Sequence, residues 1–263
     1  MSKLRGRQKV AGAVLLVALF GLGAMAQAEI VQKGNLRVNF EGKLAPKTLP
    51  RSGQAPVKVS VSAEVSSTSA KAPPPMQTMT IAINRHGHLN RTGLPVCGLE
   101  QIQPATTQDA LAVCRRSLVG EGRFLANVLL KGQAPFPSNG KVYAFNGEVD
   151  GKPAILAHVY GTQPAPASYT IPFVISPAKG TYGTTLTASF PPVKAGSGYI
   201  TGISLALGKN FSYHGKRQSY FSASCPAPPG YPGAVFAFAK ASVGFQGGHK
   251  LGSTLTRNCK ARG

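Results

Sequence analysis

Apolar and polar residues alternate over several stretches of this chain, and residues that favour turns separate those stretches. Leu36, Val38 and Phe40 alternate with polar neighbours, and residues 57–65 alternate Val or Ala with Lys, Ser and Glu. A period of two places the apolar side chains on one face of a β-strand. The 31 Gly and 21 Pro supply frequent turns. The pattern predicts an all-β fold, namely an antiparallel β-sandwich of roughly ten or more strands.

The same pattern recurs to the end of the chain. We expect further strands at residues 79–83, 124–130, 142–148, 154–160, 169–175, 184–190, 199–207, 219–225, 234–245 and 250–259. Asp150 and Gly151 are a typical two-residue hairpin turn. Residues 161–168 contain two prolines and are the best candidate for a boundary between lobes. Residues 29–263 are therefore expected to form one domain or two abutting lobes.

The N-terminal residues 1–28 have the pattern of a secretory signal peptide. Four basic residues precede an uncharged apolar run at 10–23, which small residues follow up to Ala28. That run of about 14 residues is shorter than the ~20 that a membrane-spanning helix needs. We expect cleavage before Glu29, no transmembrane anchor, and a secreted, extracellular location, either free or associated with the cell envelope.

The chain contains four cysteines, an even number that suits an oxidising compartment. Three pairings are conceivable, and we favour Cys97–Cys114 with Cys225–Cys259 because each pair closes a modest local loop. Each loop would contribute roughly 3 to 4 kcal/mol in the chain-entropy description. Zinc is the weaker alternative, because the chain has no C-x-x-C pair and no His at ligand spacing from these cysteines.

One helix is predicted, between the first two cysteines. Thr106 and Asp109 fit an N-terminal capping pattern, and Gly120 is the expected end of the helix. Cys114 would face inward, towards Cys97. The expected result is a short disulfide-tethered helix at the side of the sheet.

The predicted mature chain is strongly basic. Removing the four basic residues of the signal peptide from the 29 Lys and Arg leaves 25 against 8 Asp and Glu, a net charge of +17. Such a charge attracts polyanions in a salt-dependent way. The basic residues are nevertheless spread along the chain, so a purely solubilising surface is the competing interpretation.

One segment combines basic and aromatic residues, a composition that suits stacking and charge pairing with an anionic polymer. We predict a binding surface made of Lys209, Tyr213, Lys216, Arg217 and Tyr220, with Tyr231 nearby. Tyr at alternating positions is also typical of a core, which is the competing interpretation here.

Several short segments resemble a family of uncharacterised secreted bacterial proteins. They are residues 82–87, 93–95, 144–146, 158–161, 222–225, 232–236 and 255–259. The resemblance covers nearly the whole mature chain and implies an extracellular bacterial setting. It implies no activity and no catalytic residue.

Catalytic patterns are sparse. Two histidines, His86 and His88, flank a Gly and could offer two imidazoles to a metal, but no third ligand is identifiable, which favours a solvated turn. His158 is expected to be a hydrogen-bonded side chain within a sheet. Glu148 and Asp150 could form a glycosidase pair, although both positions are ordinary for a turn.

These observations predict a non-enzymatic extracellular or cell-envelope protein that binds anionic envelope or matrix polymers through a basic surface. Two alternatives stay open: a secreted polysaccharide-directed hydrolase, and a purely structural surface protein. No catalytic residue, cofactor or metal is predicted, and no specific nucleic acid.

Overall fold

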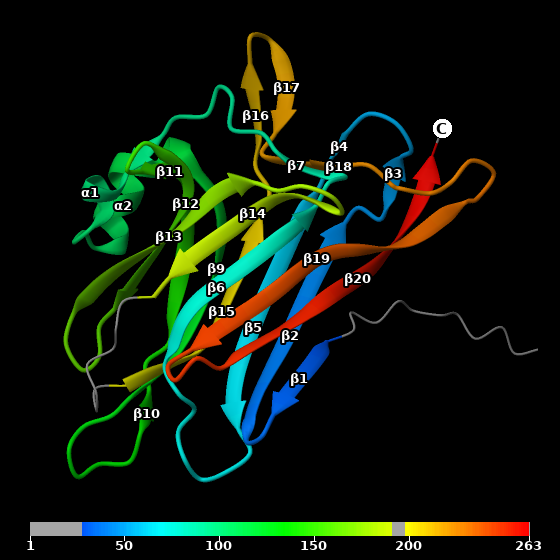
Figure 1. The fold of residues 1–263 in the computed structure, drawn as a ribbon. Coiled ribbons are helices and arrows are strands. Elements are labelled where there is room, and N and C mark those ends of the chain that lie inside the picture. The colour runs from blue at the N-terminus through cyan, green and yellow to red at the C-terminus, as the bar shows by residue number, and fades with distance from the viewer. Residues whose placement is uncertain (1–27, 191–197, 263) are drawn as a thin grey trace, which may run out of the picture.

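The computed structural model describes residues 28–190 and 198–262. Strands make up most of this region, which confirms the all-β fold (Figure 1). The predicted signal peptide lies outside the described residues, apart from Ala28. Among the residues that the structure describes, no helix is long and apolar enough to cross a membrane.

One large sheet contains 15 strands, which are antiparallel except where β8 joins β11 and β3 joins β20. Its strands, in order of hydrogen-bonding, are β1 (Glu29–Lys33), β2 (Leu36–Ala45), β5 (Lys58–Ser67), β15 (Gly198–Leu207), β9 (Leu118–Val128), β11 (Gly140–Val149), β12 (Lys152–Gly161), β13 (Ala167–Pro177), β14 (Tyr182–Ser189), β6 (Met76–Asn84), β19 (Gly233–Phe245), β20 (Lys250–Arg262) and β3 (Thr48–Pro50), with β10 (Phe136–Pro137) beside β9 and β8 (Cys97–Gly98) beside β11. Most of these strands follow the predicted alternation.

The predicted β-sandwich needs correction, because the main sheet is a strongly curled half-barrel rather than a clear sandwich (Figure 1). Hydrogen bonds continue from β1 to β3 without a break, so the twist between neighbouring strands accumulates into a curl. The concave face of one sheet thereby encloses the main core. Where β20 approaches the first strands, Arg257 Nη1 lies 2.8 Å from Glu29 Oε1, and Gly42 leaves room for the Leu255 side chain.

The predicted helix is α2 (Thr107–Cys114), and its expected cap is confirmed because Thr106 Oγ1 accepts a hydrogen bond from Asp109 N at 3.2 Å. A shorter helix, α1 (Leu99–Ile102), precedes it. The helix ends at Cys114 rather than at Gly120, since a 3-10 turn (Arg115–Ser117) leads directly into β9. We call residues 97–117 the clip.

Both predicted disulfides are confirmed. The Cα atoms are 5.6 Å apart in Cys97–Cys114 and 5.8 Å apart in Cys225–Cys259. The first bond ties the two ends of the clip, which packs on the outer face of β11 and β12 and forms a second, smaller core with Phe145 and Leu156. The second bond ties β20 to the segment that follows β18 (Phe221–Ala223).

Two small sheets complete the fold. One consists of β4 (Ala55–Pro56), β18 and β7 (Gly87–Leu89), and the other is the hairpin of β16 (Asn210–Tyr213) and β17 (Lys216–Ser219). The predicted Asp150-Gly151 turn is confirmed between β11 and β12, with φ of 51° and 69°. Of residues 161–168, only 162–166 connect β12 to β13, and these two strands pair with each other along their length.

Candidate functional site

The predicted binding segment is built around the hairpin of β16 and β17, which projects from one end of the large sheet (Figure 1). His214 and Gly215 form its turn with φ of 48° and 72°. This geometry matches a type I′ turn, which favours a two-residue hairpin. Lys216 pairs with Tyr213, and Arg217 pairs with Ser212. The side chains of Lys216 and Arg217 are exposed.

Contacts with the loop after β7 fix the hairpin in place. Asn90 Nδ2 donates a hydrogen bond of 2.9 Å to Gln218 Oε1, and Asn90 N donates to the carbonyl of Tyr220 at 2.9 Å. The Tyr213 ring lies on Gly93, where a Cβ atom would come within 2.2 Å of the ring. The other neighbour of this ring is His214, with ring centroids 4.0 Å apart. Tyr213 therefore braces the hairpin while remaining partly exposed.

Lys209 connects the base of the hairpin to the clip, because its Nζ donates a hydrogen bond to the carbonyl of Arg116. Burial lowers the pKa of Lys209, and the nearby Arg116 guanidinium lowers it further. Arg116 is itself exposed. The structure thus brings a cation of the clip next to the predicted segment, which sequence reasoning missed because 93 positions separate Arg116 from Lys209.

We call Arg116, Lys209, Lys216 and Arg217 the cationic end. The described residues contain one salt bridge, Arg257–Glu29, and it lies elsewhere. The positive charges of the cationic end are therefore not neutralised by carboxylates within the described chain. Lys216 pairs with Tyr213, which lies four residue steps beyond Lys209, so the backbones of the two lysines lie roughly 13 Å apart along the hairpin. That extent suits successive charged groups of a polymer.

Tyr220 does not belong to this surface, and its predicted role as a binding residue is corrected. The side chain is fully buried below the hairpin, and burial raises the pKa of its hydroxyl well above the ordinary value. Its hydroxyl has no hydrogen-bond partner among the described residues. Tyr231 is 64% exposed, but it lies in a different loop, which Arg51 holds through the carbonyls of Pro228 and Tyr231.

The two histidines of the predicted turn do not build a metal site. His86 Nδ1 lies 3.1 Å from Ser224 Oγ, and His88 is exposed. Burial, followed by the charges of Arg85 and His88, lowers the pKa of His86 and favours the neutral imidazole. No carboxylate hydrogen-bonds this imidazole, and no group of three metal-ligating side chains exists within the described residues. A hydrogen-bonded pair of this kind lacks the group that orients a catalytic histidine.

His158 lies within the sheet as predicted, and the carbonyl of Ile102 faces its imidazole. The side chain is fully buried, and neither ring nitrogen makes a hydrogen bond of ordinary geometry with a described residue. Glu148 and Asp150 are exposed at the turn between β11 and β12. Neither lines the shallow hollow over β2, β5, β15 and β9 or the one beside residues 65–73. A glycosidase site at these two carboxylates is therefore not supported.

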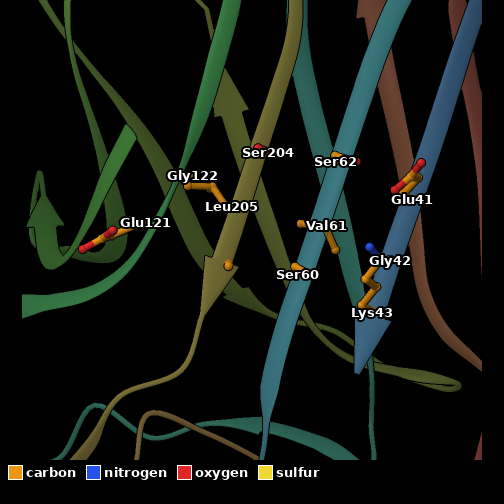
Figure 2. Close-up of a pocket in the computed structure, with 11 residues that line it drawn as sticks. Glu41, Gly42, Lys43, Ser60, Val61, Ser62, Glu121, Gly122, Ser204 and Leu205 are labelled. Carbon is orange, nitrogen blue, oxygen red and sulfur yellow. The ribbon is translucent and has the colours of Figure 1, made fainter. Parts of the chain in front are cut away.

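The structure also has a shallow hollow of about 190 Å³ on the outer face of β2, β5, β15 and β9 (Figure 2). Its floor is made of small side chains such as Ser60, Ser62 and Ser204. Two carboxylates, Glu41 and Glu121, lie on opposite sides of it, and Glu121 points away from Glu41. Two strands separate them, a lateral distance of roughly 14 Å between backbones. Glycosidase carboxylates lie roughly 5 to 10 Å apart, so this hollow does not hold such a pair.

These features leave the cationic end as the best-supported candidate site. No family model, curated protein or solved structure matches this chain. The resemblance to uncharacterised secreted bacterial proteins stays a prediction, and the candidate site stands on its geometry alone.

Proposed function

We propose that this chain is a non-enzymatic, secreted or envelope-associated protein that binds anionic polymers through its cationic end. Two disulfides and an even number of cysteines are consistent with an oxidising, extracellular compartment. The signal-peptide pattern at residues 1–28 points to the same location.

One observation carries the proposal. Four cations from two distant segments, three of them at a braced and projecting hairpin, gather at one end of the molecule, and none of them forms a salt bridge with a carboxylate of the described residues. Arg and Lys presented in this way pair with phosphate, sulfate or carboxylate groups. Tyr213 and His214 add partly exposed rings on which an organic group of the polymer can stack.

The test is a binding series with the oxidised mature protein against duplex DNA, an anionic wall polymer and a neutral polysaccharide. We expect saturable binding to both polyanions and none to the neutral chain. Binding should weaken steeply as salt rises, because each phosphate contact releases a condensed counterion. Absence of polyanion binding, or equal binding of the neutral polymer, would contradict the proposal and favour a purely structural protein.

A further inference from the structure

The clip rests on the sheet through a core of its own. Cys97, Ile102, Ala110 and Cys114 pack with Phe145 and Leu156, separately from the main core inside the half-barrel. A small, separate cluster can open locally without unfolding the rest of a protein. The Cys97–Cys114 bond would keep an opened clip compact.

A buried histidine lies on the face that the clip covers. Ala154 and Leu156 of β12 belong to the clip's core, and His158 follows them at the next position on the same face. Its exposed fraction is 0%, and the carbonyl of Ile102 in α1 faces the imidazole. Apart from this contact, neither Nδ1 nor Nε2 has a hydrogen-bond partner among the described residues.

The strand opposite adds two further buried hydroxyls. Thr170 pairs directly with His158, and Ser168 pairs with Tyr160 two positions along. The Oγ atoms of Thr170 and Ser168 are buried without hydrogen-bond partners in the described residues. Thr170 lies beside His158 on the same sheet, and neither hydroxyl carries a charge that could neutralise an imidazolium.

The charged and titratable neighbours of His158 are few. Across the strand, β11 contributes Tyr143, and β13 contributes the neutral Thr170. On the clip, Glu100 of α1 is exposed, and Asp109 of α2 is exposed and bonded to Thr106. No carboxylate is therefore buried beside the imidazole to stabilise its protonated form.

We propose that the clip carries an acid-released lid: protonation of His158 opens its residues 99–117 and exposes the Phe145–Leu156 face of the sheet. The closed clip excludes water from the imidazole, so it binds the neutral form, whereas the open clip leaves the imidazole free to take up a proton. Burial lowers the pKa of His158 in the closed form by more than the Ile102 carbonyl raises it, which agrees with this direction. Opening of the clip does not require polymer binding.

Proton linkage gives the direction in which pH changes the opening equilibrium of the clip. Above the ordinary His pKa of about 6.5, the imidazole is neutral in both forms and acid release is absent. Below it, the open form gains a proton that the closed form does not. The opening equilibrium constant then rises by up to tenfold per pH unit until the closed-state pKa is reached.

Hydrogen exchange measures this opening directly. We expect the protection factors of the α2 amides to fall by up to about thirtyfold between about pH 7 and about pH 5. Protection factors already correct for the intrinsic pH dependence of exchange. Protection in β15 and β19, which belong to the main sheet, should change much less. Protection of α2 that is unchanged over this interval would overturn the proposal.

Two variants separate His158 from the other histidines. His158→Gln should abolish the pH dependence of α2 protection. The matched control His86→Gln, which removes another imidazole with a lowered pKa, should retain it. Should His158→Gln fail to fold, NMR titration of the wild-type His158 ring replaces that variant. The lid requires the imidazole to titrate together with the loss of α2 protection. Titration of the imidazole while the clip is still closed refutes the lid.

Discussion

At the scale of single residues, Tyr220 combines a fully buried ring with a hydroxyl that has no partner among the described residues. The ring fills the space below the hairpin. The ring therefore stabilises the fold by apolar burial, and the hydroxyl adds an unpaired polar group.

This arrangement predicts that Tyr220→Phe leaves the free energy of unfolding unchanged or raises it by up to about 1 kcal/mol. Tyr220→Ala, the contrasting variant, should lower it by about 3 kcal/mol or more, since it leaves a cavity. Urea unfolding followed by circular dichroism suits this test, because the chain has no Trp. A loss above about 2 kcal/mol in Tyr220→Phe would mean that the hydroxyl has a hydrogen-bond partner.

Sequence reasoning assigned Tyr220 to the surface because it follows Lys216 and Arg217 closely. The chain changes sheets at this point: β17 ends at Ser219 and β18 begins at Phe221. The period-two rule applies within one strand, so it cannot predict the direction of a side chain that lies between two strands. His158 shows a related limit, because alternation predicts burial but says nothing about hydrogen-bond partners.

At the scale of elements, β9 and β15 approach each other unusually closely. A Cβ atom at Gly122 would lie 1.8 Å from the carbonyl oxygen of Ser204. Backbone cannot move aside as a flexible side chain can. Glycine at this position is therefore required by the pairing of the two strands.

Gly122→Ala should lower the free energy of unfolding by about 3 kcal/mol or more, because the strands must separate. Gly140→Ala in β11 is the matched control, since its nearest contact would be an ordinary 3.5 Å. The control should stay within about 1 kcal/mol of the wild type. Equal stability of the two variants, measured by urea unfolding, would show that β9 and β15 are not paired as described.

Element prediction from sequence located most of the long strands and the capped helix, where alternation or a Thr106–Asp109 pair gives a local signal. It placed the start of β9 at residue 124 instead of Leu118. It missed the hairpin of β16 and β17. Lys216 and Arg217 occupy successive positions in β17, so the sequence of this strand lacks the alternation of apolar and polar residues that predicts a strand. The hairpin depends instead on contacts with residues 90–93, more than a hundred positions away, which no local pattern encodes.

At the scale of the whole molecule, curvature was the property that alternation did not predict. Both a sandwich and a half-barrel need one apolar face per strand. What distinguishes them is whether hydrogen bonding continues from strand to strand, and here it runs from β1 to β3. The Cys225–Cys259 bond acts at this scale, because it fastens β20, near one end of the sheet, to the segment after β18.

Replacing both members of this pair, in Cys225→Ala with Cys259→Ala, should lower the free energy of unfolding by roughly 4 kcal/mol. The separation of 34 residues sets that magnitude through the entropy of the unfolded chain. The Cys97–Cys114 pair, separated by 17 residues, should contribute roughly 3 kcal/mol. Urea unfolding of both double variants checks which disulfide contributes more to the free energy of unfolding. An unchanged urea midpoint for Cys225→Ala with Cys259→Ala would contradict the prediction.

The most direct test of the cationic end compares two double variants that lose the same charge. Lys216→Ala with Arg217→Ala removes two cations of the hairpin, whereas Lys71→Ala with Lys131→Ala removes two exposed cations, one between β5 and β6 and one between β9 and β10. The two connections that carry these control residues lie at the end of the sheet opposite to the hairpin (Figure 1). Binding of duplex DNA is measured across a salt series. The hairpin variant should bind roughly ten- to a hundredfold more weakly at about 0.1 M salt, with a log–log salt slope shallower by about 2. The control should stay close to the wild type. Equal weakening of both variants would mean that the charge acts only as a general surface property, and the cationic end would not be a binding site.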